Sequence, residues 1–124
     1  MIARVWHGYT TPANADAYEA LLRREVFNGI EAKGIAGFRG IDLLRRKLGG
    51  EIEFITVMRF DSLDDIRAFV GADYELAYVP DAARQILKRF DARAQHYDLR
   101  ESRSYESQND AGEFAAALSR EVDA

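Results

Sequence analysis

Residues 38–60 read FRGIDLLRRKLGGEIEFITVMRF and predict a β-hairpin, around which the rest of the chain can be arranged. Two runs rich in apolar residues flank Gly49-Gly50, and glycine readily takes the positive φ values that a two-residue hairpin turn requires. Such a turn sets the register of the strands, so that Arg46 lies opposite Glu53 as a charge-complementary pair. The same register pairs Leu48 with Glu51, Leu44 with Ile55 and Gly40 with Arg59.

The segments on either side of the hairpin alternate between strand and helix. Residues 2–9 alternate in polarity and predict the first strand, and residues 11–29 begin with the helix-start pair Thr-Pro. After the hairpin, residues 62–71 open with a capping serine and end at a glycine, and a Pro-Asp pair opens a short helix at residues 80–90. Residues 93–100 predict the last strand. The order predicts an α+β domain of the ferredoxin-like βαββαβ type with a four-stranded antiparallel sheet.

This architecture has consequences for assembly and for domain boundaries. Helices cover only one face of such a sheet, and an apolar face left open favours a two-fold homodimer packed sheet to sheet. The domain is expected to occupy residues 1–101. Residues 102–124 turn polar and then show helical spacing, which predicts a linker and a short C-terminal helix or a disordered tail.

The composition is that of an ordinary globular protein and excludes several classes of function. The 124 residues suffice for one domain, and a net charge of −4 without a basic stripe makes a nucleic-acid partner unexpected. The absence of cysteine excludes disulfides, thiolate metal sites and cysteine nucleophiles. Neither a signal peptide nor a stretch of roughly 20 apolar residues is present, so we expect a cytoplasmic protein without a membrane span.

Short motifs along residues 1–100 form a familiar set. They are RVWHG at 4–8, AY at 17–18, GFRG at 37–40, LLRR at 43–46, EF at 53–54, FDSL at 60–63, AFVG at 68–71, AYVP at 77–80 and HY at 96–97. Together they resemble the antibiotic biosynthesis monooxygenase (ABM) domain family, whose members are small dimeric α/β-barrel proteins. The strand that ends in Phe-Asp-Ser-Leu before a helix is the most family-like piece.

The resemblance implies a small-molecule monooxygenase that acts on a phenolic or quinone-like compound without a cofactor. In such a reaction the deprotonated substrate itself reduces dioxygen, and the protein supplies a base, donors for the developing oxyanion and an apolar pocket. Haem-degrading relatives carry an asparagine on the first strand, with a tryptophan and a haem-ligating histidine in the central helical region. Residues 62–90 contain neither tryptophan nor histidine, which disfavours haem degradation.

The candidate catalytic residues are His7, His96 and Arg59. Both histidines lie on predicted strands, and they would share one sheet face if the first and last strands pair with Ile2 beside Glu101; a slip of one position separates them. Each histidine is a candidate general base or a hydrogen-bonded structural residue. Arg59 could stabilise an oxyanion or form an ion pair with a carboxylate. Two histidines without a third ligand at metal-site spacing do not predict a metal site, and we expect no cofactor.

Aromatic residues supply candidates for ligand binding. Trp6 could stack on an aromatic ligand or pack in the core or at the dimer interface. Hydroxyl groups that could bind a phenolic ligand belong to Tyr18, Tyr74, Tyr78 and Tyr97.

Two functions from different classes therefore remain. The first is an ABM-type monooxygenase, which requires an apolar cavity between sheet and helices. The second is a non-catalytic dimer of the same fold that binds a small ligand or a protein partner. An isomerase or decarboxylase would use the same acid-base groups as the monooxygenase.

Overall fold

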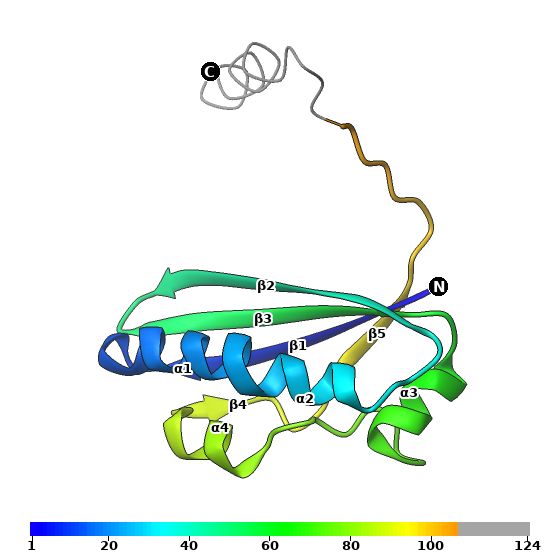
Figure 1. Ribbon diagram of the computed structural model, residues 1–124. Helices are drawn as coiled ribbons and strands as arrows, with labels where there is room; N and C mark the ends of the chain where they lie inside the picture. Colours follow the sequence, from blue (N-terminus) through cyan, green and yellow to red (C-terminus); the bar gives the residue numbers. More distant parts are fainter. Residues whose placement is uncertain (107–124) are drawn as a thin grey trace.

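The computed structural model describes residues 1–106, in which helices cover one face of an antiparallel sheet (Figure 1). This α+β arrangement confirms the predicted ferredoxin-like fold. The strands are β1 (Ile2–Thr10), β2 (Phe38–Leu48), β3 (Glu51–Phe60), β4 (Arg89–Phe90) and β5 (Gln95–Asp98). The helical segments are η1 (Pro12–Asn14), α1 (Ala15–Leu21), η2 (Leu22–Val26), α2 (Phe27–Ala32), α3 (Leu63–Val70) and α4 (Asp81–Ile86).

The hairpin of β2 and β3 has the predicted register throughout. Arg46 lies opposite Glu53, and the other three predicted pairs are present as well. Gly49 has a φ of +61°, the left-handed conformation for which glycine is favoured in a tight turn. The register shifts between Phe38 and Gly40, and Arg39 within this bulge binds Asp61 through two hydrogen bonds of 2.7 and 3.0 Å.

The first helical region extends further than predicted. Thr11 caps it as expected, its hydroxyl accepting the Asn14 N–H at 3.3 Å. The helix continues past Gly29, because Ile30 on its last turn is buried against the sheet, and it gives way to a left-handed Gly34 with a φ of +64°. Its middle part, η2, is a π-helical turn, a widening that occurs mostly at single sites within α-helices.

The predicted last strand at residues 93–100 is present only as β5, and the end of the helix predicted for residues 80–90 forms the short strand β4 instead. β4 pairs with Gly8 and Tyr9, and β5 pairs with the first half of β1, so the two short strands share one edge. Between them the Asp91 carbonyl accepts a hydrogen bond of 2.7 Å from the Trp6 indole N–H. This contact, together with the bridge between Leu76 and Arg93, diverts residues 91–94 from regular pairing.

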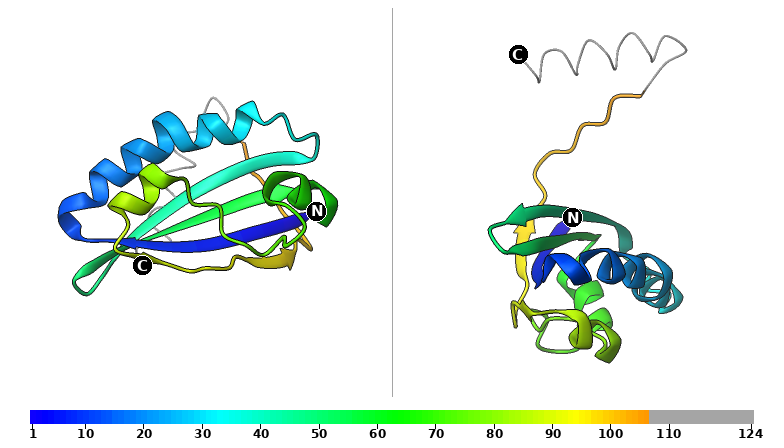
Figure 2. Two further views of the ribbon diagram at one scale, coloured as in Figure 1. Left: turned by 90° about the horizontal axis from the view of Figure 1, so that it is seen from below. Right: turned by 90° about the vertical axis from the view of Figure 1, so that its left-hand side faces the viewer.

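Side chains of the sheet separate into two faces by alternation along each strand. The helices cover one face of the sheet, which we call the inner face (Figure 2). Arg4, Trp6, Phe54 and Met58 point to this side. The opposite side, which no helix within residues 1–106 covers, is the outer face. Its residues include Ala3, Val5, His7, Tyr9, Leu44, Glu53, Ile55, Val57, Arg59 and Tyr97.

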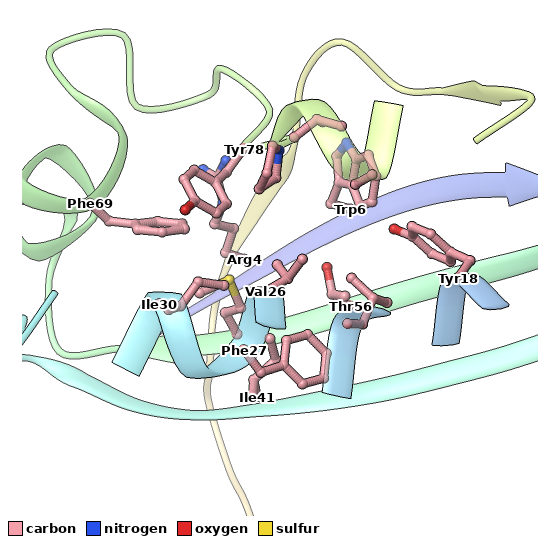
Figure 3. A pocket seen from close by; sticks show the side chains of 15 residues that line it. Arg4, Trp6, Tyr18, Val26, Phe27, Ile30, Ile41, Thr56, Phe69 and Tyr78 are labelled. Atoms are coloured by element: carbon pink, nitrogen blue, oxygen red, sulfur yellow. The ribbon is translucent and has the colours of Figure 1, made fainter. Parts of the chain in front are cut away.

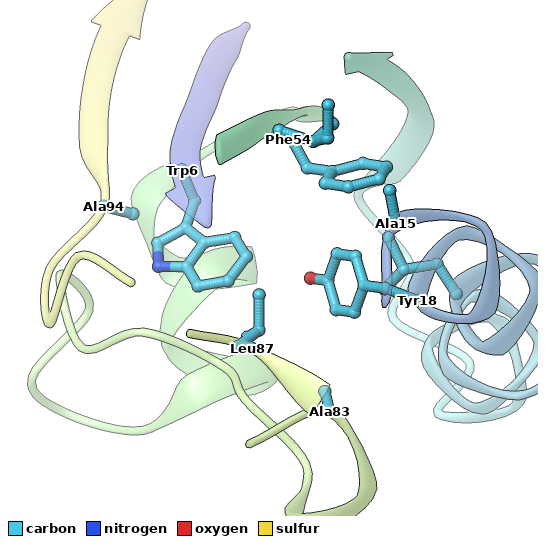
Figure 4. Close-up of a cluster of buried hydrophobic side chains, with 9 residues drawn as sticks. Trp6, Ala15, Tyr18, Phe54, Ala83, Leu87 and Ala94 are labelled. Carbon is cyan, nitrogen blue, oxygen red and sulfur yellow. The ribbon is translucent and has the colours of Figure 1, made fainter. Parts of the chain in front are cut away.

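The core on the inner face is built from two apolar clusters. One surrounds Trp6, Tyr18 and Phe54, with the Tyr18 and Phe54 rings edge to face at 4.9 Å between centroids (Figure 4). The other surrounds Phe60 and Phe69 beneath α3. The two clusters hold α1, η2, α2 and α3 against the sheet.

The domain boundary at residue 101 remains a prediction. Residues 101–106 carry no regular secondary structure, and the predicted C-terminal helix lies outside the described residues. Among the helices of residues 1–106, none has the length and apolar character needed to cross a membrane.

Candidate functional site

A cavity lies on the inner face between the sheet, the first helical region and the segment that precedes α4 (Figure 3). Its volume of about 40 Å³ has room for a few water molecules and falls well below the roughly 300–1,000 Å³ of pockets for drug-sized ligands. The wall is mostly apolar and aromatic. It consists of Arg4, Trp6, Tyr18, Leu22, Val26, Phe27, Ile30, Ile41, Thr56, Met58, Phe69, Tyr78, Val79, Pro80 and Ala83.

Of the described residues 1–106, Arg4 is the one charged residue in this wall, and its side chain is held from several directions. One guanidinium nitrogen donates to the Tyr74 carbonyl at 2.6 Å and contacts His96 Nε2 at 3.0 Å, and the other donates to the Leu76 carbonyl at 2.6 Å. The guanidinium carbon also lies 5.8 Å from the centre of the Phe69 ring. These contacts order the guanidinium beside the cavity.

The charge of Arg4 has no acidic partner within residues 1–106. The residue is only 3% exposed, and its polar contacts are two carbonyls and an imidazole. Burial lowers the pKa of Arg4 to about 10, so the guanidinium still carries its charge at neutral pH. A buried cation with neutral partners gains free energy when an anion binds beside it. The cavity therefore favours anionic over neutral ligands.

His96 lies behind Arg4, outside the cavity wall. Its ring stands edge to face with Tyr74 at 5.2 Å. Burial, followed by the nearby charge of Arg4, lowers the pKa of His96 below its ordinary value of 6.5. The neutral ring accepts a hydrogen bond at Nε2 from Arg4, which assigns the remaining proton to Nδ1. In this position His96 orients the guanidinium.

Three of the predicted ligand-binding residues line the same cavity. Trp6 and Tyr18 lie along one end, and Tyr78 packs against Phe69 with ring centroids 4.7 Å apart (Figure 3). The Tyr18 side chain is buried, and its hydroxyl points toward Trp6 across the cavity (Figure 4). Burial alone raises the pKa of this hydroxyl, so it is a neutral hydrogen-bond donor.

The other predicted site residues lie on the outer face. His7 Nδ1 is 3.2 Å from Glu53 Oε2, and the Arg59 guanidinium pairs with Asp42 at 2.5 Å. Tyr97 is mostly exposed on the same face. None of the three reaches the cavity. Of the two interpretations of Arg59, the ion pair with a carboxylate is the one that the structure shows.

The register that would pair the two histidines is not the one found, and the alternative, in which they are separated, is. Ile2 lies opposite Asp98 rather than beside Glu101, so His96 faces Arg4 and falls on the inner face, while His7 falls on the outer face. The strand that pairs with β1 at this edge is interrupted between β4 and β5, and the interruption changes the register in which β5 pairs with β1. Alternation of residues along a strand does not indicate the size of such a change.

Glu53 gathers the polar groups of the outer face around His7. Its carboxylate accepts from the Arg46 guanidinium at 2.5 Å and lies 3.4 Å from the Tyr9 hydroxyl. The Arg46 bond, followed by His7, lowers the pKa of Glu53 despite its burial. The carboxylate of Glu53 is therefore ionised at neutral pH, and its contact with His7 Nδ1 gives this histidine a structural role.

A thin wall separates the inner cavity from a hollow on the surface. Phe69, Tyr78, Val79 and Pro80 line both spaces. The surface hollow has a volume of about 370 Å³. Displacement of residues 78–80 would join the two spaces and give a ring-sized ligand access to Arg4.

Arg4 is the site residue that sequence reasoning missed. The signal was present, because Arg4 and Trp6 are two positions apart on a strand and must share a face. What the sequence did not indicate is that this face would be the buried one and would bring no carboxylate to the guanidinium.

Comparisons with solved structures bear on the fold. A candidate antibiotic biosynthesis monooxygenase from Bacillus cereus superposes with a TM-score of 0.57 at 16% identity, covering 84% of this chain and 97% of that one. This chain has the ABM fold. Rv0793 from Mycobacterium tuberculosis gives a TM-score of 0.53 at 19% identity, covering 83% and 98% of the two chains. The heme-degrader MhuD from Mycobacterium tuberculosis, with two hemes bound in its active site, gives a TM-score of 0.51 at 16% identity. The match covers 84% of this chain and 100% of that one.

The resemblance to the ABM family is thus confirmed at the level of the fold. No protein-family model matches the sequence, and no curated protein matches it.

The residues of the ABM-fold domain do not fit a haem group. A haem iron is commonly held by a histidine. His7 lies on the outer face, and His96 Nε2 is occupied by Arg4 behind the cavity wall. Within residues 1–106, no group of three or more His, Cys, Asp or Glu side chains is arranged to hold a metal ion.

Proposed function

We propose that this protein is a small-molecule oxygenase of the ABM type, which binds a phenolic or quinone-like compound in the inner cavity and needs no cofactor. The observation that carries the proposal is the buried, uncompensated charge of Arg4 in an otherwise apolar, aromatic wall. Once displacement of residues 78–80 opens the cavity to the surface hollow, a flat aromatic ring suits the apolar, aromatic wall, and an ionised ring oxygen supplies the negative charge that Arg4 lacks.

The chemistry requires that the phenol be bound as its anion. Arg4 favours the phenolate, so the phenol proton is left to the solvent. A ring carbon of the electron-rich anion donates to dioxygen and forms a C–O bond, and the resulting peroxide takes up a proton. Loss of the ring C–H proton then breaks the O–O bond, leaving a quinone carbonyl and releasing hydroxide. Phenolate and dioxygen thus give quinone and hydroxide, with four electrons passing from carbon to oxygen.

Ligand binding tests the first part of the proposal. Trp6 is the only tryptophan of the chain and lines the cavity, so its fluorescence reports directly on occupancy. We expect 2-hydroxy-1,4-naphthoquinone, which is ionised at neutral pH, to quench Trp6 about tenfold to a hundredfold more tightly than neutral 1,4-naphthoquinone, the range for a charge-assisted hydrogen bond. Equal affinities would contradict the role of Arg4.

Substitutions of Arg4 supply the controls. Arg4→Gln keeps a donor for the Tyr74 and Leu76 carbonyls but removes the charge, so preference for the ionised quinone should disappear. Arg4→Lys keeps the charge and should retain part of the preference. Thermal melting of each variant separates loss of binding from loss of folding. Preserved preference in a folded Arg4→Gln protein would overturn the assignment.

Oxygen consumption tests the reaction. We expect the protein to accelerate oxygen uptake by a hydroxyanthrone above the rate of its spontaneous oxidation, and Arg4→Gln to abolish the acceleration. Quinone should form in equal amount to the oxygen consumed.

A non-catalytic ligand-binding protein of the same fold is the second candidate function. The observation that favours it is that, among residues 1–106, neither a histidine nor a carboxylate lines the cavity, so this part of the chain places no such general base in contact with it. Tight binding of the ionised quinone without any oxygen uptake would support this function over the oxygenase.

We also propose that the chain forms a homodimer through the outer face. Leu44 and Tyr97 on this face are each more than half exposed, and Val5, Ile55 and Val57 lie beside them on the sheet. Burial of this apolar strip between two copies would remove it from water.

A further inference from the structure

Besides Arg4, the polar groups of the inner cavity include the Thr56 hydroxyl and, at the end away from Arg4, the Tyr18 hydroxyl (Figure 3). Tyr18 is 1% exposed as a residue, its hydroxyl points into the cavity, and that hydroxyl forms no hydrogen bond to another group of residues 1–106. A phenolic hydroxyl can both donate and accept a hydrogen bond, and in a mostly apolar cavity few protein groups are within its reach. An acceptor on a bound molecule would satisfy it.

The two polar groups are separated along the sheet. Tyr18 packs on Phe54, and Phe54 lies opposite Gly8 on β1, four residues beyond Arg4. Four strand residues span roughly 13 Å. The Tyr18 hydroxyl points from this level toward Trp6, which lies between Arg4 and Gly8 on β1 (Figure 4).

The surface between the two groups suits a flat, apolar middle. Trp6 lies between Arg4 and Gly8 on β1, and Met58 and Thr56 lie on the neighbouring strand. An aromatic ring system placed here has an oxygen-binding group at each end and apolar contacts along its length.

We infer that Tyr18 is a specificity residue which, together with Arg4, selects an aromatic ligand bearing two oxygens at opposite ends of its ring system. The oxygen at Arg4 is ionised, and the oxygen at Tyr18 accepts the hydroxyl proton in a hydrogen bond. This inference rests on the proposed function and adds the oxygen pattern of the ligand. A monophenol satisfies Arg4 and leaves Tyr18 without a partner.

Two ligands that differ by one hydroxyl test the inference. 2,6-Dihydroxynaphthalene has an oxygen at each end of its long axis, and 2-naphthol lacks the second. We expect Tyr18→Phe to raise the dissociation constant of the diol about threefold to tenfold, the range for one neutral hydrogen bond. The dissociation constant of 2-naphthol should change less than about twofold. Titration calorimetry at mildly alkaline pH measures both dissociation constants.

Tyr97→Phe is the matched control, because it removes a tyrosine hydroxyl from the exposed outer face. This variant should bind both ligands as the native protein does. Tyr18→Phe should melt at or above the native temperature, since the lost hydroxyl has no protein partner.

The possible outcomes are distinct. If Tyr18→Phe weakens the binding of both ligands equally, or does not weaken the binding of the diol, the role of Tyr18 is overturned while the proposed function stands. Failure of the native protein to bind either ligand overturns the proposed function and this inference together.

Discussion

Arg4 and His96 show how a residue's role depends on its buried partners. Arg4 would be an unremarkable surface cation on an exposed strand, yet here two carbonyls and an imidazole hold it at the edge of an apolar cavity. Burial, and then the charge of Arg4, lower the pKa of His96 and so favour its neutral form. Protonation of His96 would place two cations about 3.0 Å apart in a buried site.

The stability of the protein should therefore fall on acidification through His96. The unfolded chain binds this proton at the ordinary pKa of 6.5, whereas the folded chain binds it only at lower pH, so acid below 6.5 favours unfolding. We expect thermal midpoints of the native protein to drop more between pH 7.5 and pH 5.5 than those of His96→Gln, whose amide oxygen still accepts from Arg4.

Proton NMR provides an independent measurement of the same effect. The chain has two histidines, so His7→Gln assigns the remaining ring signals to His96. The titration midpoint of His96 should lie below 6.5. A midpoint at or above 6.5, or identical pH slopes for the native and His96→Gln proteins, would contradict the lowered pKa.

At the scale of elements, α3 positions one wall of the cavity. Ser62 caps this helix by accepting the Asp65 N–H at 3.3 Å, and the left-handed Gly71, with a φ of +103°, follows its last residue. Phe69 on α3 reaches the cavity beside Arg4. A local capping signal in the sequence thus places an aromatic ring at the site.

Loss of this cap should destabilise the domain. We expect Ser62→Ala to lower the free energy of unfolding by about 1 kcal/mol, the usual cost of removing a serine cap. For a domain of this size, that change corresponds to a drop of roughly 2–8 °C in the melting temperature. Ser102→Ala is the matched control, because Ser102 is exposed and outside any helix, and should melt as the native protein does. Equal melting of all three proteins would contradict the role of Ser62.

At the scale of the whole molecule, the sheet has two faces with separate tasks. The inner face holds the cavity, and the outer face holds the Glu53 cluster and an exposed apolar strip. The outer face is not needed to build the cavity within one chain. Its residues are consequently free to serve assembly.

The proposed dimer makes a direct prediction about mass. The native protein should behave in light scattering as a particle of twice the chain mass of 14.0 kDa. Leu44→Asp, at a position 52% exposed on the outer face, should shift it to the monomer mass because a buried carboxylate opposes association. Leu76→Asp is the matched control, since Leu76 is 49% exposed and lies outside the sheet. A native monomer, or a dimer unaffected by Leu44→Asp, would contradict the proposal.

The amino-acid sequence by itself determined the first three strands, the hairpin register and the helix starts. These follow from local rules: the alternation of residues 38–60, the glycine pair at the turn, and the capping residues Thr11 and Ser62 act over a few positions. The same rules placed Trp6, Tyr18 and Tyr78 among the candidates for a ligand-binding wall.

Only the tertiary structure decided which polar residues belong to the cavity. The edge pairing of β4 and β5 depends on the bond between Trp6 and the Asp91 carbonyl, 85 positions apart, and it places His96 behind Arg4 and His7 on the opposite face. A side chain's role in the site depends on burial and on distant partners. Both arise when the sheet and helices pack together, and neither is encoded in local spacing.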